Sequence, residues 1–212
     1  MRLGVLGGTF DPVHLGHLAL ARVALDELKL AKVLFVPAAR PRFKTLRRLA
    51  PAQARLDMLR LAVAGEPRFE VSTIDLERAG TTYTVDTLLR LKQELGESVE
   101  LYFLLGADAL AEFPAWRAPE RILGMCYLVT AARPGCPPPD LVTLEQALPA
   151  SRGRVIVLQG PHIDVSATEV RRRVAAGQPL SGLVPPAVEQ YIKDRGLYRR
   201  ARPEPPKGSC HG

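Results

Sequence analysis

Short apolar runs alternate with amphipathic helical stretches along most of the chain. The apolar runs predict buried strands at residues 1–8, 33–36, 101–105, 127–129 and 155–158. Helical spacing places two apolar faces between them, one formed by Leu18, Ala21, Leu25 and Leu28, the other by Leu56, Leu59 and Val63. This alternation predicts a mostly parallel sheet with helices on both faces, a Rossmann-like, doubly wound α/β fold.

The same pattern predicts a single domain over residues 1–198, because neither an internal repeat nor a linker interrupts it. Residues 199–212 lack apolar periodicity, and we expect a disordered tail there. Two proline-containing loops, residues 37–48 and 133–139, follow predicted strands. Ligands of open α/β sheets bind at the carboxyl ends of strands, so both loops are candidate parts of a binding site.

The amino-acid composition limits the class of protein and the kind of ligand to be expected. The 212 residues are 47% hydrophobic and 24% charged, as in ordinary globular proteins. No apolar run of about 18 residues predicts a membrane span. The net charge is +7, with 23 Arg against 6 Lys. Arginine makes planar bidentate contacts with phosphate and carboxylate groups, so this excess suits a nucleic acid and a small phosphorylated ligand equally well.

Cysteine use and the N-terminal residues bear on the compartment. Cys126, Cys136 and Cys210 are too few and too irregularly spaced for a disulfide framework or a zinc site, so we expect buried or incidental thiols. Glycines interrupt the N-terminal apolar stretch too early for a signal sequence. Both observations favour a reducing cytoplasm.

Residues 7–17, Gly-Gly-Thr-Phe-Asp-Pro-Val-His-Leu-Gly-His, carry the strongest chemical signal. Two glycines at a strand end let the backbone approach a ligand, and the following helix start offers free N–H groups that favour phosphate. His14 and His17 are three residues apart, so both can face one ligand and donate to phosphate oxygens. Neither GxGxxG nor GxxxxGK[ST] occurs, which excludes the NAD fingerprint and the P-loop.

A second anion site is predicted near the C-terminus. Ser166 and Glu169 have the spacing of a capping box, and a capped helix start favours anions. Neighbouring residues diverge by about 100° around a helix, so only one of Arg171, Arg172 and Arg173 can face that site.

Taken together, these segments resemble a known family. Residues 14–17 match the HxGH signature of the nucleotidyltransferase superfamily, and residues 7–17 as a whole are similar to those of bacterial nicotinate-nucleotide adenylyltransferases. Residues 165–171 resemble the family's ISSTxxR signature, with Val165 in place of Ile and Ala167 in place of the second Ser. Further matches, in the family's order and within residues 2–198, are 82–87, 105–108, 113–116, 133–135 and 183–192.

The resemblance implies a set of site residues. The implied catalytic residues are His14, His17, Lys44 and Arg171. The implied ATP contacts are Gly7, Gly8, Thr9, Phe10, His14, His17, Gly106, Asp108, Ser166, Thr168 and Arg171, with residues 166–198 as a helical part of the ATP site. The implied contacts to nicotinate mononucleotide are Thr82, Tyr83, Thr84, Trp116 and Arg133, with Trp116 stacked on the nicotinate ring. Judged without the family, Trp116 equally fits core packing and Asp108 equally fits a helix cap.

One loop departs from the family pattern. Residues 37–44 resemble the family's P-P-H-[KR] loop, but Arg42 and Phe43 replace Pro and His, whereas Lys44 is kept. We expect Arg40 or Arg42 to supply a substitute charge.

The implied reaction transfers AMP from ATP to nicotinate mononucleotide, giving deamido-NAD and pyrophosphate, a step of NAD biosynthesis. The acceptor phosphate is already anionic, so the step needs positioning and charge neutralisation rather than a side-chain base. No cluster of acidic ligands is evident in the sequence, and Mg²⁺ is therefore expected on the ATP phosphates rather than on a protein site.

Two alternatives stay open at this point. One is a pantetheine-phosphate adenylyltransferase of the same superfamily, although those enzymes carry Thr where this chain has His14. The other is an RNA-binding or nucleotide-sensing protein, suggested by the isoelectric point near 9.7. Nucleic acid is the less favoured partner, because polyanion binding requires neither the spaced histidines nor the Ser-Thr-Arg signature. A homo-oligomer is also left open.

Overall fold

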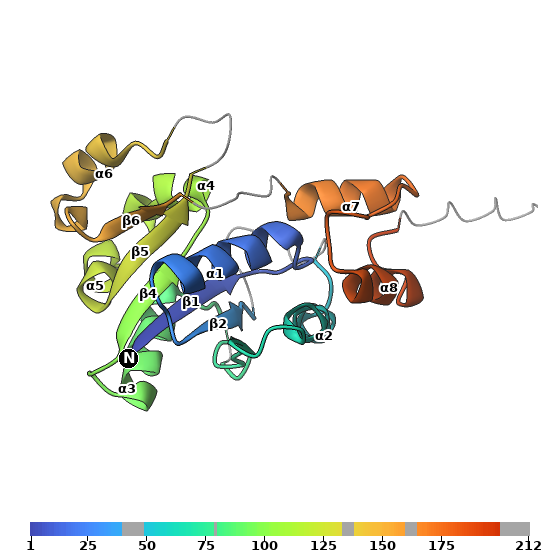
Figure 1. Cartoon of the computed structure of the whole chain (residues 1–212), viewed down its shortest axis with the longest axis horizontal. Helices are drawn as coiled ribbons and strands as arrows, with labels where there is room; N and C mark the ends of the chain where they lie inside the picture. The colour runs from blue at the N-terminus through green and yellow to red at the C-terminus, as the bar shows by residue number, and fades with distance from the viewer. Residues whose placement is uncertain (40–48, 79, 133–137, 160–164, 200–212) are drawn as a thin grey trace, which may run out of the picture.

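The protein is built around one parallel sheet (Figure 1). The computed structural model describes residues 1–39, 49–78, 80–132, 138–159 and 165–199. In this part of the chain the strands pair in the order β3-β2-β1-β4-β5-β6, and every pairing is parallel. The strands are β1 (Arg2–Gly8), β2 (Lys32–Pro37), β3 (Phe69–Val71), β4 (Glu100–Leu104), β5 (Cys126–Ala131) and β6 (Val155–Leu158).

Helices follow the strands along the chain. The α-helices are α1 (Leu15–Glu27), α2 (Ala52–Val63), α3 (Thr84–Leu95), α4 (Ala107–Ala111), α5 (Pro119–Met125), α6 (Leu141–Ala147), α7 (Ala167–Ala175) and α8 (Pro186–Asp194). Single 3-10 turns are η2 (Phe113–Ala115) and η3 (Pro149–Ser151). No helix within the described residues is long and apolar enough to cross a membrane.

Each face of the sheet has its own apolar core, because neighbouring residues of a strand point to opposite faces. Leu6 and Leu104 belong to the core on one face, which includes side chains of α1, α2, α7 and α8. Val5 and Phe103 belong to the core on the other face, with side chains of α3, α5 and α6. The doubly wound α/β fold predicted from the sequence is therefore confirmed.

The direction in which strands are added reverses beside β1. The chain passes from β1 to β2 and β3 on one side, and then returns to place β4 on the other side. In open α/β sheets a crevice forms at the carboxyl ends of the two strands that flank such a reversal, and ligands bind there. The fold thus points to the ends of β1 and β4 before any side chain is considered.

The apolar and helical patterns predict five of the six strands and the helices α1 and α2, whereas β3 and α3 are among the elements that they do not predict. β1, β2, β4, β5 and β6 lie where apolar runs predict them, and α1 and α2 lie where the helical spacing predicts them. β3 has only three residues, too few for a pattern to be distinguished. α3 begins at Thr84, inside a segment identified only through the family motif.

α7 and α8 lie beyond the carboxyl end of β1, far from the N-terminus (Figure 1). The N–H of Leu15, at the start of α1, donates to the carbonyl of Leu183, between α7 and α8, at 2.9 Å. The Tyr191 hydroxyl on α8 donates to Oδ2 of Asp57 on α2 at 2.8 Å. These bonds bring residues 166–198 to the same end of the sheet as residues 7–17. Of the tail predicted at residues 199–212, the structure describes Arg199, whose Nη2 donates to the Lys193 carbonyl at 3.3 Å, and residues 200–212 lie outside the described residues.

Candidate active site

The connection from β1 to α1 forms one side of the candidate site. β1 ends at Gly8, and α1 begins after His14, its N-cap residue. Gly7 is close to β4, because a Cβ built on it would lie 3.3 Å from the Phe103 ring. Phe10 adopts a left-handed φ of 48°, and its buried ring packs edge-on against His17 with 5.0 Å between centroids. The first turn of α1 is thereby held against the end of β1.

His14 and His17 lie against one another on this turn. Their ring centroids are 3.7 Å apart and their planes differ by 28°. The backbone N–H of His14 donates to Nδ1 of His17 at 3.2 Å. An Nδ1 that accepts this bond carries no proton, so the neutral His17 ring carries its proton on Nε2. The two rings share one face of the turn, as their spacing predicts.

His14 is the buried member of the pair, at 8% exposure. Burial lowers the pKa of His14 from 6.5 to about 4, so its imidazole is neutral at pH 7. Its Nδ1 atom is also buried, and no described residue hydrogen-bonds to it. A neutral imidazole can still donate one N–H bond to a phosphate, without the cost of holding a buried charge.

Behind the histidines lies a buried carboxylate that sequence reasoning did not single out. Asp11 is 1% exposed, and its Oδ1 accepts hydrogen bonds from the Ala50 N–H at 3.1 Å and the Tyr198 hydroxyl at 2.8 Å. Burial and the neighbouring Asp11 charge raise the pKa of Tyr198 well above its usual value, so the hydroxyl keeps its proton. This bond closes the C-terminal segment onto the β1–α1 connection, across 187 positions of the sequence.

Arg55 on α2 ties together the loops that follow β1 and β2. The side chain is 2% exposed, and its Nη1 donates to the carbonyls of Thr9 at 2.7 Å and Ala38 at 2.8 Å. Its remaining donors reach the carbonyls of Ala39 at 3.2 Å and Ala50 at 3.3 Å. A guanidinium presents its donors in a rigid fork, so one buried side chain fixes the relative positions of several loop carbonyls.

The start of α7 is capped at the same end of the sheet. The Ser166 Oγ accepts the Glu169 N–H at 3.2 Å, which confirms the cap half of the predicted capping box. The Glu169 carboxylate pairs with Arg172 and Arg173, and these bonds lower its pKa to about 2. The Glu169 carboxylate thus pairs with Arg172 and Arg173 instead of accepting the backbone N–H of Ser166.

Arg171 is the arginine of α7 that points toward the β1–α1 connection. Its Nη1 donates to the Asp11 carbonyl at 2.7 Å and lies 3.9 Å from Oδ2 of the same residue. Its Nη2 donates to the Thr168 Oγ1 at 3.1 Å. Arg171 is thus the residue of this run that contacts the β1–α1 connection, whereas Arg172 and Arg173 pair with Glu169. A role of Arg171 toward ATP stays a prediction.

Two cavities meet at the carboxyl ends of β1 and β4. The first, here the α3 cavity, measures about 250 Å³, and its lining includes Gly7, Gly8, Thr9, Asp75, Thr82, Tyr83, Thr84, Phe103, Trp116 and Arg117. The second, here the α7 cavity, measures about 360 Å³, and its lining includes Gly7, His14, His17, Phe103, Gly106, Trp116 and Ser166. Gly7, Phe103 and Trp116 line both, so the two cavities adjoin at these residues.

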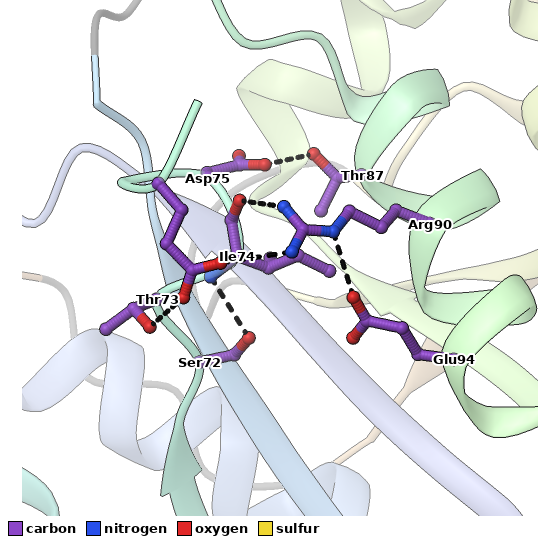
Figure 2. A network of polar contacts seen from close by, with 8 residues as sticks. Ser72, Thr73, Ile74, Asp75, Thr87, Arg90 and Glu94 are labelled. Carbon is purple, nitrogen blue, oxygen red and sulfur yellow. Dashed lines mark hydrogen bonds and ion pairs between the residues drawn. The ribbon is translucent and has the colours of Figure 1, made fainter. Parts of the chain in front are cut away.

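A polar network supports the wall of the α3 cavity (Figure 2). Asp75 is buried, and its Oδ1 accepts the Thr87 hydroxyl of α3 at 2.7 Å. Burial raises the pKa of Asp75 above its ordinary value. Arg90, one turn further along α3, donates to the Ile74 carbonyl at 3.1 Å and pairs with Glu94 at 2.9 Å. The segment before α3 is thus bonded to the helix that it precedes.

Trp116 stands between the cavities. Its ring packs at 6.1 Å against Phe103, nearly perpendicular, and at 5.4 Å against Phe113. The side chain is half-buried and the rest of it lines both cavities. Core packing and ligand stacking, the two roles considered for this residue, are therefore compatible.

The predicted residues divide between the cavities. Thr82, Tyr83 and Thr84 line the α3 cavity with Trp116, as a common acceptor pocket requires. Of the residues assigned to ATP, His14, His17, Gly106 and Ser166 line the α7 cavity, whereas Gly8 and Thr9 line the α3 cavity. Phe10 lies in the core against His17, and Thr168 contacts Arg171.

The remaining predicted residues either have a different place in the structure or lie outside its described part. The N-cap of α4 is Gly106, with Asp108 at the second position of the helix, so the capping role considered for Asp108 is wrong. Lys44 and Arg133 lie outside the described residues, as do Arg40, Arg42 and Phe43. Within the described residues, no group of three or more His, Cys, Asp or Glu side chains is arranged to hold a metal ion.

Sequence reasoning missed Asp11, Arg55, Tyr198 and the two charged residues of the α3 cavity, Asp75 and Arg117. One signal was available for Arg55. It precedes Leu59 and Val63 at four-residue spacing, which places a charge on the buried face of α2. A charge there predicts buried polar partners.

Comparison with known proteins agrees with this geometry. Residues 5–173 match the model of the cytidylyltransferase-like family. The chain is 44% identical over 200 residues to a Dehalococcoides mccartyi protein named "Probable nicotinate-nucleotide adenylyltransferase", covering 94% of this chain and 98% of that one. It is 46% identical over 198 residues to a protein of the same name from Thermomicrobium roseum, covering 93% and 92%.

Solved structures share the fold. The Plasmodium falciparum nicotinic acid mononucleotide adenylyltransferase, in a structure described as complexed with NaAD, superposes with a TM-score of 0.75. That match covers 93% of this chain and 97% of the other at 20% identity, so it supports the architecture alone. The family model and the curated relatives span most of the chain, and on their evidence the protein belongs to the nicotinate-nucleotide adenylyltransferase family.

Proposed function

We propose that the protein transfers the AMP group of ATP to the phosphate of nicotinate mononucleotide, giving deamido-NAD and pyrophosphate. One observation carries this proposal: the α3 and α7 cavities share Gly7, Phe103 and Trp116. Two ligands seated there would meet at the ends of β1 and β4, as the direct reaction of two substrates requires.

The α7 cavity fits the triphosphate. His14 and His17 line it from the start of α1, and Ser166 lines it from the capped start of α7. Helix starts and imidazole N–H groups are suited to phosphate oxygens. Arg171, bonded to Asp11, stands beside this cavity, and the family resemblance adds Lys44 as a further cation.

The α3 cavity fits the nicotinate mononucleotide. It combines the Trp116 ring with the helix start at Thr84 and the backbone of Gly8 and Thr9. A flat pyridinium ring can stack on Trp116, and backbone N–H groups at the start of α3 can donate hydrogen bonds to a negatively charged substituent. Arg133 is proposed as a phosphate contact from the resemblance alone.

The chemical step is an in-line displacement without a covalent enzyme intermediate. An oxygen of the acceptor phosphate forms a bond to the α-phosphorus of ATP, while the bond from that phosphorus to the bridging oxygen breaks and pyrophosphate leaves with the electron pair. The attacking oxygen is already an anion, so no residue need remove a proton. Neutral N–H donors such as Nε2 of His17 then stabilise the charge that moves toward the leaving group.

Mg²⁺ would enter with the ATP phosphates. The described residues gather no group of acidic, His or Cys side chains to hold it, which fits an ion carried by its nucleotide. When bound it would neutralise phosphate charge.

Cys126 is a buried free thiol whose pKa is raised by burial to about 12, and we propose the reducing cytoplasm as the compartment in which such a protein works.

The test is a product assay with ATP, Mg²⁺ and each candidate acceptor in turn. With nicotinate mononucleotide we expect deamido-NAD and pyrophosphate in equal amounts. Pyrophosphate release with phosphopantetheine instead would assign the chain to the other adenylyltransferase activity. Binding of RNA by the chain, with no turnover of either acceptor, would leave the proposal without support.

A further inference from the structure

Arg117 is a charged residue of the α3 cavity to which the family resemblance assigns no role. It follows Trp116 directly and lines the cavity with Tyr83 and Thr84. Its guanidinium carbon lies 4.6 Å from the centroid of the Tyr83 ring. The Arg117 guanidinium thus makes a cation–π contact with the Tyr83 ring, a common arrangement for arginine.

The backbone holds this side chain in place. η2 ends at Ala115, and the N–H of Trp116 donates to the Phe113 carbonyl at 3.0 Å. Ala118 has a left-handed φ of 52° and is the N-cap residue of α5. Arg117 therefore sits between two fixed turns, with its neighbour Trp116 packed on Phe103 and Phe113.

The charge of Arg117 is available to a ligand. Two other arginines near the ends of the strands have polar partners, since Arg55 donates to loop carbonyls and Arg171 to the Asp11 carbonyl. Within the described residues, Arg117 forms no ion pair, and its guanidinium lies over the Tyr83 ring. The residue is exposed on the solvent side of the cavity, where a small anion can reach it.

The other charged group of the α3 cavity is Asp75. Its carboxyl is buried and holds the Thr87 hydroxyl, so it does not pair with Arg117. A carboxylate on a substrate ring would be repelled by an ionised Asp75 and attracted by Arg117. Arg117 is the single Arg or Lys among the described residues that line this cavity.

We propose that Arg117 selects the acid form of the pyridine mononucleotide by binding the ring carboxylate. The inference rests on the proposed function, because it assumes that the pyridine ring stacks on Trp116. Arginine forms bidentate bonds with a carboxylate, whereas a carboxamide offers no negative charge and only one acceptor oxygen. Because the two mononucleotides differ only at this substituent, the contact raises the affinity for the acid more than that for the amide.

The experiment compares wild-type protein with Arg117→Gln and Arg117→Lys in kcat/KM for nicotinate mononucleotide and for nicotinamide mononucleotide. The matched control is Arg121→Gln, which removes another exposed arginine, on α5 and outside both cavities. We expect Arg117→Gln to lower the acid-to-amide ratio about tenfold, the size of one lost charged contact at a partly exposed site, with the KM for ATP unchanged. Arg117→Lys should keep part of the preference, and Arg121→Gln should keep all of it.

Equal losses for both acceptors would overturn the proposal, because they would place Arg117 on the phosphate that both share. An unchanged ratio would overturn it as well. The sole tryptophan gives a second measurement that needs no turnover, since quenching of Trp116 fluorescence reports binding of each mononucleotide. If wild-type protein made no dinucleotide from either acceptor, the proposed function itself would fail. That outcome differs from an unchanged acid-to-amide ratio, which would overturn only the role of Arg117.

Discussion

The α7 and α3 cavities differ in how their charged groups are held. On the α7 side, Arg171 donates to the carbonyl of Asp11, and the almost fully buried Asp11 carboxylate accepts the Tyr198 hydroxyl. In the α3 cavity Asp75 is buried and bonded to Thr87, but Arg117 is exposed, and its contact within the described part of the chain is the Tyr83 ring. Rigid, preorganised groups stabilise a transition state, whereas an available charge selects between substrates. The comparison assigns catalysis to one side of the crevice and selection to the other.

The largest effect is expected at His17. We predict that His17→Ala lowers kcat by about 10² to 10³, because losing one preorganised donor to a transition-state charge has typically this effect. The KM for ATP should change much less. Steady-state kinetics over both substrates measures this, with far-ultraviolet circular dichroism to verify that the variant is folded.

Two further substitutions sharpen this prediction. His17→Asn keeps an acceptor for the His14 N–H but loses the Nε2 donor, so it should be as slow as His17→Ala. His17→Gln retains a donor at similar reach and should recover part of kcat. If His17→Ala kept full kcat and only raised the KM for ATP, the histidine would contribute to binding and not to the chemical step.

The buried network around Asp11 should matter for stability. Tyr198→Phe removes the hydroxyl that donates to Asp11 at 2.8 Å, and we expect a loss of about 2 kcal/mol in unfolding free energy, as for a bond to a buried charged acceptor. Tyr191→Phe is the matched control, because its hydroxyl bonds to the less buried Asp57, where water can substitute. Urea denaturation should show a loss below about 1 kcal/mol for that control. Equal losses of unfolding free energy in the two variants would mean that the hydrogen bond to buried Asp11 contributes no more than the one to Asp57.

The pKa of His14 predicts how stability depends on pH. Burial lowers it from 6.5 to about 4, so between these values the unfolded chain binds a proton that the folded protein does not. Stability should therefore fall as the pH drops from 7 to 5, with about 2 kcal/mol of the loss due to His14. Denaturation of wild-type protein and His14→Gln at both pH values isolates this share. An equally steep dependence in the variant would show that His14 titrates normally.

The smallest effect is expected at the wall between the cavities. Trp116→Ala should raise the KM for nicotinate mononucleotide roughly 5- to 10-fold, since stacking contributes about 1 kcal/mol beyond area burial. The KM for ATP should change less, even though the ring lines both cavities. Equal increases for both substrates would indicate that Trp116 shapes the crevice without stacking on the pyridine ring.

Sequence patterns predict those features of the fold and site that depend on residues close together in the chain. Apolar runs predict five of the strands, and the His14–His17 spacing predicts the stacked pair, because each depends on residues close in sequence. The bond from Tyr198 to Asp11 spans 187 positions, and no periodicity connects them. The sequence does not predict Arg117 as a site residue either. An exposed arginine becomes a candidate ligand contact only when folding places it beside Trp116 and Tyr83 at a cavity.

The central claim is that ligands of the two cavities react with each other directly. The stereochemical course at the α-phosphorus tests it most directly, with an adenosine 5′-O-(1-thiotriphosphate) of known configuration and nicotinate mononucleotide as acceptor. A single in-line displacement predicts that the configuration at phosphorus is inverted in the dinucleotide product. Retention would require two successive displacements through a covalent adenylyl-enzyme, and would contradict direct transfer between the α7 and α3 cavities.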